Sequence, residues 1–332
     1  MADELELLRG ANPVPSHGPH FGDGPLDHEA ERRLERLLRE RPSGRLRDRL
    51  VPGIGRPRLA WGLVATAVVA ALALTLVLSG PNTTPAVAAP RPLVVQTGST
   101  PLPLDRLAER AEQAAADGSP RLRKGTHVQS WSMGMSDDKP PITLPEERIV
   151  RWRADGSHTE LVVATDPRHP GRPVLSTEGG EPHLVDDGHV LSDQTYPPSW
   201  SDAPPQSPPP HDPARLRAYL TEAQYTDTPL TAPQLLDAVE VLLDHWTLGT
   251  RETAALARLL AGTEGLRPVG QVTDRLGRRG QAYVYDGAGA RRMLIMDPVT
   301  GAVLGLESTF STAEPEYGVK KGDVMSYSAW MR

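Results

Sequence analysis

The sequence predicts an α+β protein in which a curved, half-barrel-like antiparallel sheet packs on a central helical block, preceded by one transmembrane helix. Three observations predict this fold. Residues 59–78 contain no charged side chain. Alternating apolar and polar residues with hairpin turns occupy 126–164 and return at 269–331, which is typical of antiparallel strands. Between them, residues 213–262 have helical spacing of their leucines. The order strands, helices, strands indicates an α+β class.

The uncharged run is long enough to cross a bilayer. Twenty helical residues reach about 30 Å, the thickness of the hydrocarbon core. An isolated span must be helical, because lipid offers no partners for free backbone groups. A buried helix of a soluble protein and a cleaved signal peptide, ending at the Ala-Val-Ala of residues 86–88, are the alternatives. The run is longer than a signal core and begins late, so the span is favoured.

The flanks of the run predict its orientation. Five arginines precede it against the single acid Asp48, whereas residues 79–90 carry no charge. Basic flanks stay inside, which predicts a single-pass protein of the cell membrane with a cytoplasmic N-terminus and an extracellular C-terminal domain. The predicted parts are a largely disordered cytoplasmic segment with a short helix near 27–40 (1–58), a transmembrane helix (59–79), a proline-rich stalk (80–103) and an exterior α+β domain (104–332).

Composition excludes several kinds of chemistry. The chain has no cysteine, which rules out disulfides, thiol catalysis and thiolate metal sites. Its net charge is −6, and acids outnumber bases beyond residue 58, so we expect no nucleic-acid partner. His183 and His189 flank the turn Asp186-Asp187-Gly188, an arrangement that we interpret as a solvated turn. We therefore expect no metal and no cofactor.

The chain before residue 213 is predicted to begin with a helix and continue in strands. The Asp155-Gly156 pair is a strong hairpin signal between two of the strands. Residues 192–213 are rich in proline and are predicted to form an exposed loop. The predicted elements are a helix at 104–116, strands at 126–135, 148–154 and 158–164, and a weaker strand pair at 182–185 and 189–191.

The second half of the domain is predicted as three helices followed by hairpins. The first helix is expected to begin after Asp212 and run over 213–224. Thr231 and Thr250 are expected to cap the second and third helices, and the third ends at Gly262. Residues 297–301 read as a type I turn that ends in glycine. The predicted strands are 271–276 with 281–285, 292–296 with 302–310, and a last strand at 323–331.

Flexible sulfur and aromatic side chains suggest a ligand-binding surface. Methionine and tryptophan side chains adapt to apolar ligands and can line a groove. The same composition suits an ordinary core, so both interpretations stay open at this stage. The predicted ligand-binding residues are Trp131, Met133, Met135, Trp152, Met293 and Met296.

Recognised catalytic motifs are missing from the sequence. There is no Gly-x-Ser-x-Gly elbow, phosphate loop or dinucleotide fingerprint. Asp274 and Asp297 lie in turns, and aspartate commonly caps turns by accepting backbone N–H bonds. The sequence therefore predicts that the protein is not an enzyme, with an extracytoplasmic hydrolase as the least favoured alternative.

Several turns and strand ends carry a family likeness. They are Gly-Leu-Arg-Pro-Val-Gly at 265–270, residues 272–280, residues 296–305 and the Trp-Arg-Ala-Asp-Gly-Ser of 152–157. With the span, they resemble a family of uncharacterised actinobacterial single-span membrane proteins, often encoded beside extracytoplasmic-function sigma factors. More remotely, a half-barrel on helices resembles the lipoprotein-carrier fold and its sigma-regulatory relatives.

The resemblance implies partners rather than chemistry. It implies an exterior domain that binds a ligand or an envelope protein or lipid, and a cytoplasmic segment that modulates a sigma factor. The alternative that it implies is a carrier of envelope lipid or lipoprotein. A hollow interior under the helices would favour the carrier, whereas a filled core would count against it.

Overall fold

The computed structural model describes residues 90–331 apart from 137–138, 199–200 and 202. The predicted cytoplasmic segment (1–58), the predicted transmembrane helix (59–79) and the first part of the predicted stalk lie outside these residues. Among the described helices, none has the length and apolar character needed to span a bilayer.

The predicted α+β class is confirmed. Ten strands form one antiparallel sheet with the order β6-β3-β2-β1-β12-β11-β10-β9-β8, in which β7 also pairs with β1. The helices described are α4 (Leu104–Ala114), α5 (Pro213–Ala223), α6 (Ala232–His245) and α7 (Thr250–Ala261). The strands of the sheet are β1 (Arg123–Ser136), β2 (Lys139–Trp152), β3 (His158–Ala164), β6 (His189–Tyr196), β7 (Trp246–Thr247), β8 (Arg267–Thr273), β9 (Arg279–Asp286), β10 (Ala290–Met296), β11 (Val303–Phe310) and β12 (Val324–Trp330). The short strands β4 (Val174–Ser176) and β5 (His183–Val185) form a separate ribbon.

Local signals explain where several elements begin and turn. Asp212 caps α5 by accepting a bond from the Arg215 N–H at 2.8 Å. Thr231 and Gln234 form a capping box at the start of α6. In the β2–β3 turn, the Asp155 carboxylate accepts bonds from the N–H and hydroxyl of Ser157 at 2.9 and 2.6 Å. The start of α5 after Asp212, the cap at Thr231 and this hairpin confirm the sequence predictions.

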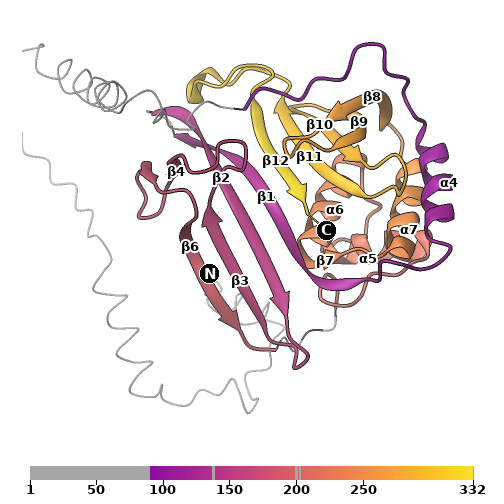
Figure 1. Ribbon diagram of the computed structural model, residues 1–332. Coiled ribbons are helices and arrows are strands. Elements are labelled where there is room, and N and C mark those ends of the chain that lie inside the picture. Colours follow the sequence, from indigo (N-terminus) through magenta and orange to yellow (C-terminus); the bar gives the residue numbers. More distant parts are fainter. Residues whose placement is uncertain (1–89, 137–138, 199–200, 202, 332) are drawn as a thin grey trace, which may run out of the picture. The chain divides into compact units, whose positions relative to one another are not determined.

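One face of the sheet packs on the helices. Figure 1 shows β12 to β8, together with β1, bending around α5, α6 and α7. Fully buried leucines of the helices, such as Leu220, Leu235 and Leu256, meet Leu294 and Trp330 from the sheet in one apolar cluster. This cluster is the main core of the domain.

The opposite face of the same strands carries a second core. Trp131, Tyr327 and Met293 belong to it, and Leu93 and Val95 pack over it. The Gln96 N–H donates to the Gln271 carbonyl at 2.8 Å, so the segment also covers the edge of β8. We call residues 91–99 the strap. The strap corrects the predicted stalk: this part of residues 80–103 belongs to the folded domain, because its apolar side chains have a surface to cover.

The sheet continues beyond the helices as a more exposed region, which we call the wing and define as β2, β3 and β6. Figure 1 shows the wing projecting away from the helices. Every residue of β11 is buried, whereas no residue of the edge strand β6 is. We call the part formed by the helices, β8 to β12 and the strap the closed half.

Several predictions about elements are wrong. The strand predicted at 271–276 is β8 at Arg267–Thr273, because the turn capped by Asp274 follows it. The predicted pairing of 182–185 with 189–191 does not form, because β5 pairs with β4 and β6 pairs with β3. β6 continues to Tyr196, into the predicted loop. β2 starts at Lys139 instead of 148, since Pro140, Pro141 and Pro145 hide the alternation of a real strand. The cap of α7 is Gly249 rather than Thr250.

Candidate functional site

The register of the sheet divides the six predicted ligand-binding residues between its two faces. Trp131 pairs with Tyr327, Tyr327 with Glu307, and Glu307 with Met293, so these side chains share a face. Met133 alternates with Trp131 along β1 and lies on that face too, whereas Met135 lies in an irregular stretch between Gly134 and Ser136. Trp152 and Met296 lie on the opposite face, toward which the helices pack. The structure does not gather the six into one groove.

The six predicted ligand-binding residues also differ in how far they are exposed to solvent. Trp131, Met293 and Met296 are 1%, 4% and 0% exposed, and each contributes to a core cluster. This placement fits the ordinary-core alternative for these three. Met135 is 47% exposed and Met133 and Trp152 are half-buried, so a ligand role for them stays a prediction.

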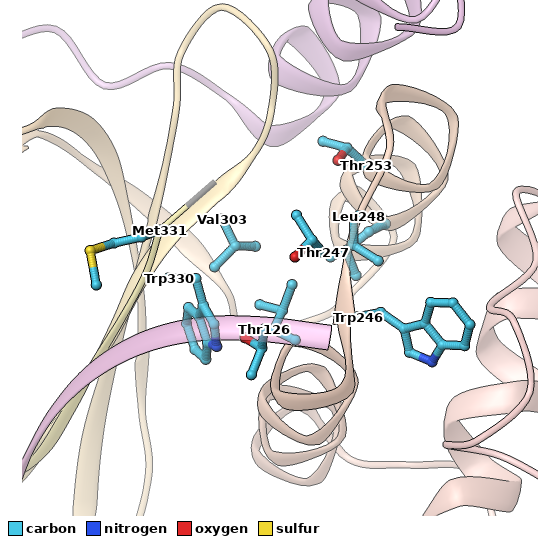
Figure 2. Close-up of a pocket in the computed structure, with 10 residues that line it drawn as sticks. Thr126, Trp246, Thr247, Leu248, Thr253, Val303, Trp330 and Met331 are labelled. Atoms are coloured by element: carbon cyan, nitrogen blue, oxygen red, sulfur yellow. The ribbon is translucent and has the colours of Figure 1, made fainter. Parts of the chain in front are cut away.

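The interior beneath the helices is filled. The cavity there has a volume of about 20 Å³, close to what one water molecule needs. Figure 2 shows Thr126, Val303 and Trp330 on the sheet side of this cavity and Leu248 and Thr253 on the helical side. Such a space has no room for an acyl chain.

An open groove of about 520 Å³ lies at the start of β1. We call it the β1 groove. It forms where β1 changes partner, because β12 pairs with residues 128–132 and β7 with 123–125. Its volume lies within the range of small-molecule sites. The residues that line it are Arg123, Lys124, Gly125, Thr126, His127, Ile149, Val150, Arg151, Trp152, Thr247 and Met331.

Gly125 shapes the floor of the β1 groove. The pairing with β7 shifts register between Lys124 and Gly125, and Gly125 has φ of +112°. A Cβ on this residue would lie 2.4 Å from the Val150 carbonyl oxygen. The bulge therefore requires glycine, because other residues would clash and would rarely adopt this backbone conformation.

A column of stacked side chains forms one wall of the groove and crosses the wing. The Lys124 ammonium lies 3.7 Å from the centre of the Trp152 ring. The rings of Trp152 and His158 stack at 4.2 Å, and those of His158 and Tyr196 at 4.8 Å. Burial lowers the pKa of His158, which favours the neutral ring inside the stack. The column fixes Trp152 beside the groove.

The Arg and Lys side chains that line the β1 groove have no acidic residue among the other described lining residues. These side chains are two arginines and a lysine. Arg123 and Arg151 are exposed, and within the described ranges neither side chain has an ion-pair or hydrogen-bond partner. His127 is paired to Glu147, with 2.5 Å between Nε2 and Oε1. The groove can therefore attract an anion.

Two half-buried acids of α6 contact the sheet. The Ser328 hydroxyl donates to Glu240 at 2.8 Å, and the Trp330 indole N–H donates to Asp244 at 3.2 Å. Burial raises the pKa of both carboxyls. Each carboxyl group accepts a hydrogen bond from an uncharged donor on β12, so we assign both acids to the packing of α6 on the sheet.

The aspartates of the turns behave as predicted. Asp274 accepts bonds from the N–H groups of Leu276 and Arg278 at 3.0 and 2.7 Å. Asp297 accepts from those of Val299 and Thr300, both at 2.8 Å. Turn capping accounts for both carboxylates.

The two histidines of the Asp186-Asp187-Gly188 turn have separate partners. His183 Nδ1 lies 2.9 Å from the Glu181 carbonyl, and His189 Nε2 lies 2.8 Å from a Glu178 carboxylate oxygen. In the part of the chain that the structure describes, no three His, Asp or Glu side chains are grouped to hold a metal ion.

Comparisons with known proteins add no family. No family model and no curated protein matches the chain. The similar solved structures include two inactive mutants of the CurK dehydratase and the dehydratase domain from the CurK module of the curacin polyketide synthase. They are 10–12% identical, cover 70–73% of this chain and 82–84% of their own, and have TM-scores of 0.11–0.12. Scores at this level carry no argument about fold or function.

Proposed function

We propose that the chain is a single-span membrane protein whose extracellular α+β domain binds a ligand or partner at its surface. The cytoplasmic segment 1–58 would then modulate an extracytoplasmic-function sigma factor. The observation that carries the binding role is the contrast between a filled interior, with about 20 Å³ free, and an open groove of about 520 Å³. The non-enzymatic role rests on the turn-capping positions of Asp274 and Asp297 and remains part of the proposal.

The filled interior makes the lipid-carrier alternative the weaker one. A carrier must enclose apolar chains, and the leucines of α5, α6 and α7 already occupy that space. The half-barrel likeness to the lipoprotein-carrier fold is supported by the bending of the sheet around these helices (Figure 1). Fold likeness of this kind leaves function open.

The regulatory half can be tested on the cytoplasmic segment. Residues 1–58, fused to an affinity tag, should retain an extracytoplasmic-function sigma factor of the same organism. A matched variant with Leu34, Leu37 and Leu38 changed to serine should lose it, because these leucines form the apolar stripe of the predicted helix. Equal retention by both segments, or an unchanged sigma-dependent reporter after deletion of the gene, would sink the regulatory role.

The carrier alternative can be tested on the full chain. The protein is purified in a mild detergent and released from the micelle in the mass spectrometer. Its mass should show no bound lipid once loosely associated lipid has been washed away. A stoichiometric lipid that is lost when Leu256 is enlarged to tryptophan would favour the carrier, because Leu256 borders the small interior cavity.

A further inference from the structure

The β1 groove is basic on a chain whose C-terminal part is acidic. Acidic side chains outnumber basic ones beyond residue 58. The groove reverses this balance locally, since its described lining contains Arg123, Lys124 and Arg151 and no acid. Like charges on neighbouring strands destabilise a sheet, and within the described residues the Arg123 and Arg151 side chains have no ion-pair partner, so these two arginines need an explanation other than stability.

The register brings the two arginines to the same part of the groove. Arg151 pairs directly with Gly125, and Arg123 precedes Gly125 by two residues. Both side chains line the same groove, and each is long enough to reach toward one bound group. Gly125 contributes no side chain between them.

The remaining lining residues complete an amphipathic site. Ile149, which lies on the same face of β2 as Arg151, and Met331 give it an apolar side. The planar guanidinium of arginine offers forked donors that match the two oxygens of a carboxylate or phosphate. This combination favours a small organic anion over a purely apolar molecule.

We propose that the β1 groove binds the oxyanion group, phosphate or carboxylate, of a ligand whose apolar part lies against Ile149 and Met331. Arg123 and Arg151 hold the anion, on the face of β2 opposite to the one that carries Trp152. The inference rests on the proposed function, because it names the ligand class of the exterior domain.

The test uses the full chain with a charge-matched control. Binding of inorganic phosphate and of acetate is measured by calorimetry at constant ionic strength in a neutral detergent. The variant Arg123→Gln with Arg151→Gln should bind phosphate at least tenfold more weakly than the wild type. The control, Arg215→Gln with Arg279→Gln, removes two exposed arginines elsewhere and should stay within twofold.

A second arm distinguishes a free anion from a lipid headgroup. The same proteins are reconstituted in phosphatidylcholine nanodiscs with or without phosphatidylglycerol, and phosphate binding is measured again. If phosphatidylglycerol weakens phosphate binding by the wild type and not by the groove variant, the site binds a lipid headgroup. If phosphatidylglycerol has no effect on phosphate binding by the wild type, the site binds a soluble anion.

Three results would overturn the inference. They are no phosphate or acetate binding by the wild type, equal weakening in both double variants, and full binding by the groove variant. None of them bears on retention of the sigma factor by residues 1–58, so the inference can fail while the regulatory proposal stands.

Discussion

The closed half and the wing belong to one sheet but differ in how their side chains are covered. In the closed half, β11 is buried along its whole length between the helices and the second core. In the wing, β3 has one buried residue and β6 has none. Stability is therefore concentrated in the closed half. The wing is joined to the closed half through β1, and its strand β2 lines the open β1 groove. Substitutions in the wing should therefore lower the free energy of unfolding less than substitutions in the closed half.

Each region contains an arginine–glutamate ion pair, and the two pairs differ in how far they are exposed to water. The Arg275–Glu307 pair of the closed half is 5% and 2% exposed, whereas the Arg148–Glu160 pair of the wing is 30% and 22% exposed. Burial raises the pKa of Glu307, while the hydrogen bond from Arg148 lowers the pKa of Glu160. Removing one member of each pair compares the two environments directly.

The largest expected effect is on the buried pair. Glu307→Gln should lower the free energy of unfolding by about 3–5 kcal/mol, because the Arg275 charge would remain buried without its carboxylate. Glu160→Gln should cost roughly 0–1 kcal/mol, since water reaches the wing pair. Urea unfolding of the full chain measures both, and similar costs would remove the distinction between the regions.

Leucine truncation compares apolar packing in the two regions. Leu294 of β10 is fully buried, so Leu294→Ala should cost about 2–5 kcal/mol through lost contacts and a cavity. Leu161 of β3 is half-buried, and Leu161→Ala should cost about 1 kcal/mol. The same unfolding assay applies. A larger loss at Leu161 would show that the wing is covered by something that the described residues do not include.

Buried and paired acids should give stability profiles of opposite slope. Burial raises the folded-state pKa of Asp244, so its contribution is most favourable in acid and is lost as the pH rises through that pKa. Asp244→Asn should therefore stabilise the protein more at pH 8 than at pH 4, relative to the wild type. Glu160 has a lowered pKa, so its contribution is present above its ordinary pKa and is lost as the pH falls. Glu160→Gln should cost more at pH 8 than at pH 4, and parallel profiles for the two variants would contradict the assignment.

The smallest effect on stability is expected in the groove. Arg123→Gln with Arg151→Gln should change the free energy of unfolding by no more than about 0.5 kcal/mol, because both side chains are exposed and unpaired in the described structure. Thermal unfolding without added anion checks this. A marked loss would mean that the arginines support the fold, and it would weaken their assignment to a ligand.

Local signals in the sequence were enough for several elements of both the closed half and the wing. The capping box at Thr231, the Asp297 turn and the strand His158–Ala164 are encoded by neighbouring residues, and the structure confirms them. The pairing of β6 with β3 and the strap over the second core depend on residues distant in the chain. The β1 groove was missed for the same reason. It needs a partner exchange between β12 and the two-residue strand β7, which no periodicity reveals.

Amide hydrogen exchange on the full chain tests the contrast between the two regions most directly. Amides of β9, β10 and β11 should exchange only through global unfolding, whereas those of β3 and β6 should exchange through smaller openings and at least about a hundredfold faster. Added phosphate should slow exchange at the start of β1 and the end of β2, around Gly125 and Arg151. Uniform protection of wing and closed half, with no response of β1 to phosphate, would contradict this account.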